Sequence, residues 1–368
     1  MLLQERSIKK ILMTADTVGG VWTYALDLCR SFQSRGIQVC LATMGAPLSA
    51  SQQQEAGEIP GLDIRESHYK LEWMDNPWGD VARAGEWLLE LEREVEPDII
   101  HLNGYTHAAL NWNAPVVAIA HSCVLSWWQG VLREPAPAAW NEYKNRVSQG
   151  LQSADAVVAI SQTYAGELQK LYGPIDNLSV IYNGRDTGSF YTADKKKQVF
   201  AMGRIWDEAK NLSLLGSIEN KAHLPILIAG NNRHPDTRTL IEIPNVQLLG
   251  KLSQAEVKAQ LAQSYIYILP ARYEPFGLSV LEAASSGCLL LLADIPTLRE
   301  LWQDTALYFN PDLPEELDNL LDYVLLHPEE CKLLVEQSTA RTRLFTLDTM
   351  AENYLELYEL LLVVHKQP

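Results

Sequence analysis

The chain has 368 residues, more than a single hydrophobic core usually supports, so two domains are expected. Hydrophobic residues make up 47% of the chain and charged residues 21%, which is typical of a soluble globular protein. The net charge is −16, so global charge does not draw this protein to nucleic acid or to anionic lipid, and nucleic acid is not an expected partner.

The cysteines and the apolar segments indicate a cytoplasmic protein. The five cysteines are odd in number and form no C-x-x-C pair, as expected for free thiols in a reducing compartment. Residues 1–10 are too polar and charged for a signal peptide. No apolar run approaches the ~20 residues that a membrane span needs. We therefore expect no transmembrane segment and, at most, peripheral contact with the inner face of a membrane.

The first elements predict a doubly wound sheet. Residues 11–14 have the pattern of a strand, residues 21–34 that of an amphipathic helix, and residues 37–43 that of a second strand. This order is typical of a parallel α/β domain. Gly19 and Gly20 lie between the first strand and the helix, outside any G-x-G-x-x-G or Walker A motif. They form either a simple tight turn or a loop whose backbone approaches a ligand.

His121 is a candidate ligand contact. Residues 45–97 predict an irregular segment followed by a helix at 87–94, and strands are predicted at 98–103 and 115–120. His121 comes directly after the last of these strands. Open α/β sheets bind ligands at the carboxyl ends of their strands, which favours a binding role. The alternative is a histidine that hydrogen-bonds to nearby backbone.

A second predicted domain begins, like the first, with a strand. Its first strand is predicted at 198–202, and two cations follow it, Arg204 and Lys210. An arginine fork and a lysine point charge, six positions apart at the mouth of a strand, can straddle a diphosphate. In an acidic chain any phosphate site must come from such local charges. The alternative is a pair of solvated loop cations.

The segment at 265–286 predicts a strand, a tight turn and a helix. The apolar run 265–269 precedes the turn, and the helix is expected at 278–286. The free N–H groups of Gly277, Leu278 and Ser279 would then point outward at a helix N-terminus. Such an end is a natural anion site.

Two carboxylates flank this turn. Glu274 precedes it, and Glu282 lies just over one turn into the helix. A carboxylate placed behind an anion site cannot bind the phosphate, but it can accept hydrogen bonds from sugar hydroxyls. The alternative is an ordinary strand–turn–helix with a solvated Glu274 and a surface Glu282.

The last part of the chain predicts a strand and a long helix. Residues 288–293 have the pattern of a buried strand, and Asp294-Ile295-Pro296 follows it. Thr349-Met350-Ala351-Glu352 matches a capping box, which predicts a helix from there to about residue 363.

The stretch from Glu274 to Glu282 resembles the signature of the family 4 retaining glycosyltransferases, group 1. In both, two glutamates are separated by seven residues around Pro-Phe-Gly. Gly203-Arg204 and Lys210-Asn211 also match family pairs. The resemblance covers nearly the whole chain, except that Asp294-Ile295-Pro296 replaces a frequent glycine pair. It implies the GT-B fold, in which two Rossmann-like doubly wound domains face each other across a cleft. The implied segments are an acceptor-side domain at 1–185, a nucleotide-sugar domain at 186–347, and a C-terminal helix at 348–368 that returns to the first domain.

The resemblance also implies roles for the candidate residues. Arg204, Lys210 and the helix N-terminus would hold the leaving diphosphate. Glu282 would bind the nucleotide ribose, and Glu274 and His121 would contact the donor sugar. The wider donor-binding set comprises Gly19, Gly20, Arg204, Lys210, Gly230, Asn231, Gly250, Lys251, Phe276, Gly277, Leu278, Ser279 and Glu282.

The implied activity is retaining transfer of a hexose, with UDP-glucose as the first candidate donor and a saccharide or lipid-linked saccharide as the acceptor, in polysaccharide biosynthesis. No metal motif and no cofactor motif is present, so neither is expected. Two alternatives stay open: a GT-B sugar phosphorylase, which would usually carry pyridoxal phosphate, and a two-domain sugar-binding protein without catalysis.

Overall fold

The computed structural model describes residues 8–365 except 234–238, and the chain divides into two compact units. The chain passes from unit 1 to unit 2 after Gly184 and returns to unit 1 after Thr346. Each of these points lies one residue before a predicted boundary, since the boundaries were expected after residues 185 and 347. Unit 1 comprises Met1–Trp128, Glu134–Gly184 and Leu347–Pro368, and unit 2 comprises Gln129–Arg133 and Arg185–Thr346.

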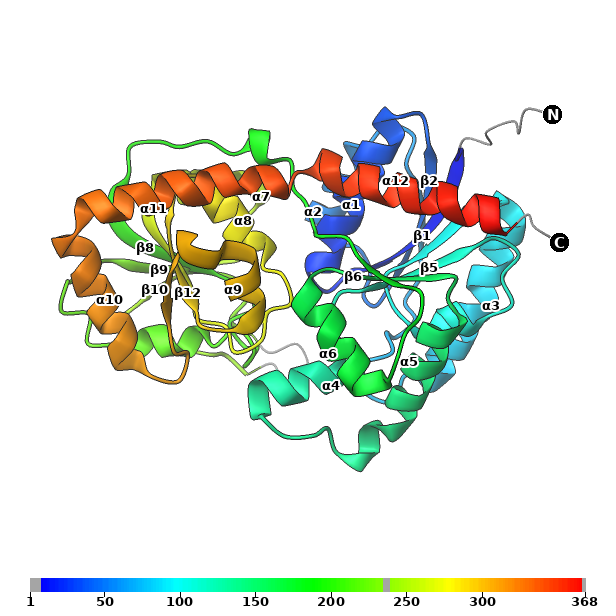
Figure 1. The fold of residues 1–368 in the computed structure, drawn as a ribbon, viewed down its shortest axis with the longest axis horizontal. Coiled ribbons are helices and arrows are strands. Elements are labelled where there is room, and N and C mark those ends of the chain that lie inside the picture. The colour runs from blue at the N-terminus through cyan, green and yellow to red at the C-terminus, as the bar shows by residue number, and fades with distance from the viewer. Residues whose placement is uncertain (1–7, 234–238, 366–368) are drawn as a thin grey trace. The chain divides into compact units, whose positions relative to one another are not determined.

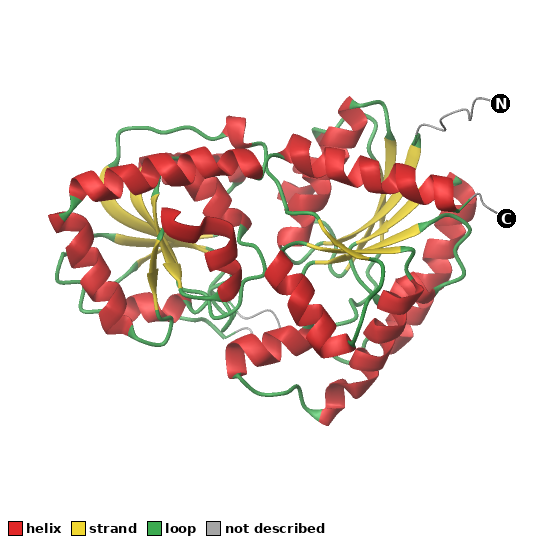
Figure 2. Ribbon diagram, viewed as in Figure 1, coloured by secondary structure: helices red, strands yellow, loops and turns green. Residues whose placement is uncertain are grey.

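Unit 1 contains a parallel sheet with the strand order β3-β2-β1-β4-β5-β6-β7, covered by helices on both faces (Figures 1 and 2). The strands are β1 (Lys10–Asp16), β2 (Gln38–Met44), β3 (Asp63–Glu66), β4 (Ile99–Leu102), β5 (Val116–Ala120), β6 (Ala156–Ala159) and β7 (Leu178–Val180). The helices are α1 (Gly20–Ser34), α2 (Ala50–Gly57), α3 (Trp78–Val95), α4 (Val124–Trp127), α5 (Asn141–Ser153), α6 (Gln162–Tyr172) and α12 (Leu347–Val364). Because successive strands are added first on one side of β1 and then on the other, the sheet has its switch point between β1 and β4.

The last helix of the chain packs in unit 1, as predicted. The ring of Tyr358 in α12 lies 6.0 Å from that of Phe32 in α1, and Tyr354 lies 6.3 Å from Tyr24. All four rings are buried, which explains why α12 joins this unit although unit 2 precedes it in sequence.

Unit 2 contains a second parallel sheet, with the order β10-β9-β8-β11-β12-β13 and the switch point between β8 and β11. The strands are β8 (Lys196–Met202), β9 (Ile226–Ala229), β10 (Gln247–Gly250), β11 (Ser264–Leu269), β12 (Leu289–Ala293) and β13 (Leu307–Phe309). The helices are α7 (Gln254–Gln263), α8 (Leu278–Ser285), α9 (Pro296–Trp302), α10 (Pro314–Leu326) and α11 (Pro328–Arg341). The apolar run of β12 is buried along its whole length, as expected for a strand covered on both faces.

Two local predictions are wrong. Residues 45–97 contain α2 and β3, and α3 begins at Trp78 instead of residue 87. The two glycines in the first half of α3 hide its periodicity, although Val81, Ala84 and Leu88 are buried on one face. The capping box at Thr349 is also absent, because α12 begins at Leu347 and Thr349 already lies inside it.

Candidate donor site

The predicted residues of unit 2 lie along one edge of its sheet. Arg204, Gly230 and Gly250 stand at the carboxyl ends of β8, β9 and β10, and Glu274 follows β11. Because the strands are parallel and adjacent, these segments lie at the same edge of the sheet, and those after β8 and β11 flank its switch point.

The two predicted diphosphate-binding cations, Arg204 and Lys210, are each held by a carboxylate. The guanidinium of Arg204 lies 2.6 Å from Asp207, and the ammonium of Lys210 lies 2.6 Å from Glu274. Asp207 is buried, whereas the Arg204 side chain is 41% exposed, so the arginine stands between a buried partner and solvent. Asp207 was not predicted as a partner of Arg204 from the sequence, although an acidic residue three positions after an arginine is a common ion-pair spacing.

Backbone contacts bring the two charged loops together. The carbonyl of Ala209 accepts from the N–H of Arg272 at 2.9 Å and from that of Tyr273 at 3.4 Å. Asn211 adopts a left-handed φ of 52°, and its amide donates to the carbonyls of Pro270 and Pro311. These bonds fix the start of the β11 loop against the β8 loop, so Lys210 and Glu274 meet although they are distant in sequence.

The turn before α8 has the predicted form. Gly277 is the N-cap residue with φ of 85°, a conformation that favours glycine, and Leu278 opens the helix. The first N–H groups of such a helix have no intrahelical acceptor. Phe276 is buried, with its ring 5.7 Å from that of Phe345, so its side chain anchors the turn.

Glu282 is buried in α8 and forms an ion pair that was not predicted from the sequence. Its carboxylate lies 2.8 Å from the guanidinium of Arg185, and the two side chains are 11% and 8% exposed. The Glu274 side chain is 12% exposed and paired with Lys210. The alternative of a solvated Glu274 and a surface Glu282 is therefore wrong.

Gly230 brings two loops into close contact. A Cβ atom at this position would lie 1.8 Å from the carbonyl oxygen of Gly203, so only glycine fits. The Gly230 N–H donates to the carbonyl of Gly250 at 2.8 Å. Asn231 stabilises its own loop, because its side-chain oxygen accepts from the N–H of Arg233. Lys251 is exposed beside them.

The other predicted residues stand at the corresponding edge of unit 1. Gly19 and Gly20 open α1 after β1, and a Cβ atom on Gly20 would meet nothing within 4 Å. Asp16 accepts from the N–H of Val18 at 2.6 Å, so it caps the turn. His121 follows β5; its Nε2 lies 2.8 Å from Oδ1 of Asn103, and burial lowers the pKa of its imidazole to about 3.

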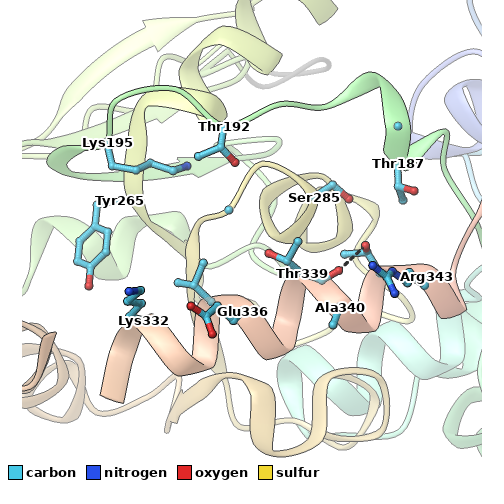
Figure 3. Close-up of a pocket in the computed structure, with 14 residues that line it drawn as sticks. Thr187, Thr192, Lys195, Tyr265, Ser285, Lys332, Glu336, Thr339, Ala340 and Arg343 are labelled. Atoms are coloured by element: carbon cyan, nitrogen blue, oxygen red, sulfur yellow. Dashed lines mark hydrogen bonds between the residues drawn. The ribbon is translucent and has the colours of Figure 1, made fainter. Parts of the chain in front are cut away.

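A pocket of about 680 Å³ lies elsewhere in unit 2 (Figure 3). It is bordered by α11 and by residues at the amino ends of β8, β11 and β12, the edge opposite the candidate donor site. Its most buried cation, Lys195, donates to the carbonyls of Leu261 and Ser286, and Thr339 donates to that of Ala284. These groups stabilise helix ends, so the pocket does not compete with the predicted site.

The loop that departs from the family pattern has its own ion pair. Asp294 accepts two hydrogen bonds of 2.7 Å from Arg299, which lowers the pKa of its carboxyl group, and Pro296 opens α9. Over residues 8–233 and 239–365, no group of three or more His, Cys, Asp or Glu side chains is arranged to hold a metal ion.

Comparison with known proteins identifies the family. The pattern of Glycosyltransferase Family 4 matches residues 18–189, and that of Glycosyl transferases group 1 matches residues 189–341. The chain therefore belongs to the family 4, group 1 glycosyltransferases.

Individual relatives are distant. Glycogen synthase of Mycobacterium tuberculosis is 25% identical over 247 residues, which cover 60% of this chain and 58% of that protein. The chain thus spans less than two thirds of that relative. None of the helices among the described residues is both long and apolar enough to cross a bilayer.

Two solved structures have the same fold. Sucrose-phosphate synthase from Thermosynechococcus elongatus has a TM-score of 0.79 at 16% identity, covering 97% of this chain and 100% of that one. HepE of Anabaena, in complex with UDP and glucose, has a TM-score of 0.76 at 15% identity, covering 95% and 99%. The fold is that of the GT-B glycosyltransferases, as predicted.

Proposed function

We propose that this protein transfers a hexosyl group from a nucleoside-diphosphate sugar to a saccharide or glycolipid acceptor, with retention of anomeric configuration. Family membership supports a glycosyl transfer. The structure of HepE with UDP and glucose makes UDP-glucose the first candidate donor. The relationship to a glycogen synthase favours a role in polysaccharide biosynthesis.

The observation that carries the proposal is the arrangement of Arg204, Lys210 and the α8 N-terminus around one sheet edge. Negative charge develops on the diphosphate as the glycosidic bond breaks. Two cations and a helix N-terminus at fixed positions stabilise that charge more than they stabilise the intact donor. On this proposal the protein's own groups carry the charge, so neither a metal nor a cofactor is needed.

The two glutamates would then do different work. Glu274, shared between Lys210 and a donor-sugar hydroxyl, would respond to positive charge that builds on the sugar ring. Glu282, held by Arg185, would accept hydrogen bonds from the ribose in substrate and transition state alike. No side chain is assigned as a covalent nucleophile, and the acceptor would attack on the face from which the diphosphate leaves. The five buried free thiols suit a reducing cytoplasm.

A panel of sugar nucleotides tests the proposal. Full-length protein should be protected against thermal unfolding by its own donor, with UDP-glucose first, because a ligand that binds only the folded state raises the midpoint. The same donor should be consumed when saccharide acceptors are added, and EDTA should leave the rate unchanged. Protection without sugar transfer would indicate a binding protein, release of sugar 1-phosphate with inorganic phosphate would indicate a phosphorylase, and loss of activity restored by Mg²⁺ would contradict metal independence.

Glutamine variants separate the two carboxylates. Glu282→Gln should weaken binding of donor and of free UDP together, by about one to two decades, because the ribose contact is present in both. Glu274→Gln should lower kcat more than it raises KM and leave the Kd of UDP nearly unchanged. Calorimetry on UDP and steady-state kinetics on the donor measure these effects. The opposite pattern would mean that the two roles are exchanged.

A further inference from the structure

Asn103, the first residue after β4, makes three hydrogen bonds to neighbouring strands. Its N–H donates to Oγ1 of Thr14 at 2.9 Å, and its side-chain amide nitrogen donates to the carbonyl of Thr14 at 2.7 Å. Its Oδ1 lies 2.8 Å from Nε2 of His121. Thr14 is buried in β1, so Asn103 links the first strand of the sheet to the histidine after β5.

This arrangement determines which atom of the Asn103 amide faces the histidine. A backbone carbonyl only accepts hydrogen bonds, so the NH₂ group must be the part that faces Thr14. The atom facing His121 is then the amide oxygen, which also only accepts. Nε2 of His121 must therefore carry the hydrogen.

The protonation of the other ring nitrogen follows. A neutral imidazole carries one hydrogen, so Nδ1 of His121 is an acceptor. Among the described residues no side chain or backbone group hydrogen-bonds to this Nδ1, and His121 as a whole residue is half-buried. The nearest aromatic neighbour, Tyr24, contacts the ring edge-on, with centroids 4.6 Å apart.

The surroundings keep this histidine neutral. The neighbouring His101 is fully buried, and its two nitrogens face the hydroxyls of Tyr24 and Tyr358. Burial lowers the pKa of both imidazoles to about 3, and none of these neighbours carries a negative charge that would favour an imidazolium. His121 is therefore poorly suited to bind a phosphate or to donate a proton.

We propose that Asn103 is a positioning residue, which holds His121 as the Nε2–H tautomer and so presents Nδ1 as an acceptor to a substrate hydroxyl at the carboxyl edge of the unit 1 sheet. The tautomer stands on the hydrogen bonds alone, whereas the identity of the hydroxyl rests on the proposed function. The ligand group at this position must then be a hydrogen-bond donor, which a sugar hydroxyl is and a phosphate oxygen is not.

Nitrogen NMR of the full-length protein tests the tautomer directly. In protein labelled with ¹⁵N-histidine, two-bond proton correlations near neutral pH distinguish a protonated ring nitrogen from an unprotonated one. The His121 signals, assigned by their loss in His121→Gln, should show Nε2 protonated and Nδ1 bare. A protonated Nδ1 would overturn the proposal, and this measurement requires no change at Asn103.

A carboxylate at position 103 tests the consequence. Asn103→Asp keeps the size and the acceptor that faces His121, but it loses the NH₂ group that donates to the Thr14 carbonyl. Its carboxylate favours the imidazolium, which adds a hydrogen to Nδ1 and abolishes its role as acceptor. We expect two protonated nitrogens and about tenfold lower kcat/KM for the donor, with UDP binding unchanged. Asn141→Asp, an exposed change in α5, is the matched control and should alter neither.

The outcomes separate this inference from the proposed function. A cationic His121 in Asn103→Asp with unchanged donor kinetics would overturn the assignment of Nδ1 as the acceptor for a substrate hydroxyl. A wild-type protein that consumes no sugar nucleotide would contradict the proposed function, while the tautomer result would still decide the role of Asn103.

Discussion

Replacing Arg204 or Lys210 by alanine is expected to lower the turnover of donor by ~10²-fold or more, the loss typical of a transition-state charge contact. Each side chain stands at the edge of the unit 2 sheet, where its charge would face the leaving diphosphate. The free energy of this contact grows as the bond breaks, so kcat should fall more than donor affinity. Steady-state kinetics on both single variants provide the measurement.

The controls distinguish charge from geometry. Arg204→Lys keeps the charge but loses the planar fork, so it should recover only part of the rate. Lys221→Ala removes an exposed cation whose partner, Glu219, is also exposed, and it should leave turnover unchanged. Circular dichroism should show that each variant keeps its fold. Near-normal rates in both Arg204→Ala and Lys210→Ala would contradict the site assignment.

Replacing Arg185 by methionine is expected to lower the free energy of unfolding by ~3–5 kcal/mol, the cost of breaking a buried ion pair. The change deprives the buried carboxylate of Glu282 of its cation. Arg185 also donates its backbone N–H to the carbonyl of Phe345, which lies next to the last residue of unit 2, Thr346. That bond is unaffected by the substitution, so the loss reports on the side chain.

A double variant isolates the pair. Arg185→Met combined with Glu282→Leu removes both charges and should be more stable than Arg185→Met alone, because no charge is then left buried without its partner. Lys221→Met at an exposed pair should cost less than ~1 kcal/mol. Urea unfolding followed by tryptophan fluorescence provides the measurement. Equal stabilities of Arg185→Met and the double variant would contradict the expected cost of leaving the Glu282 carboxylate buried without its cation.

Local sequence patterns predicted most strands and the turn before α8. A strand, a glycine turn and a helix depend on residues a few positions apart, so Gly277 and the start of α8 were found from the chain alone. The prediction failed where local signals were weak. Glycines masked the first half of α3, and a polar edge strand, Asp63–Glu66, lacked the apolar alternation that marks a strand.

The chain by itself also determined which residue types stand at the ends of the strands, because each strand and the turn after it are contiguous in sequence. That is why the positions of Arg204, Lys210, Glu274 and His121 after their strands could be predicted without a structure. Arg204 pairs locally with Asp207, three positions later, but only the tertiary structure decided the partners that are distant in sequence. Glu282 pairs with a residue 97 positions earlier, and Asn103 joins Thr14 to His121, because the order of strands in a parallel sheet sets which loops become neighbours. Strand order depends on how whole elements pack together, and no local pattern encodes it.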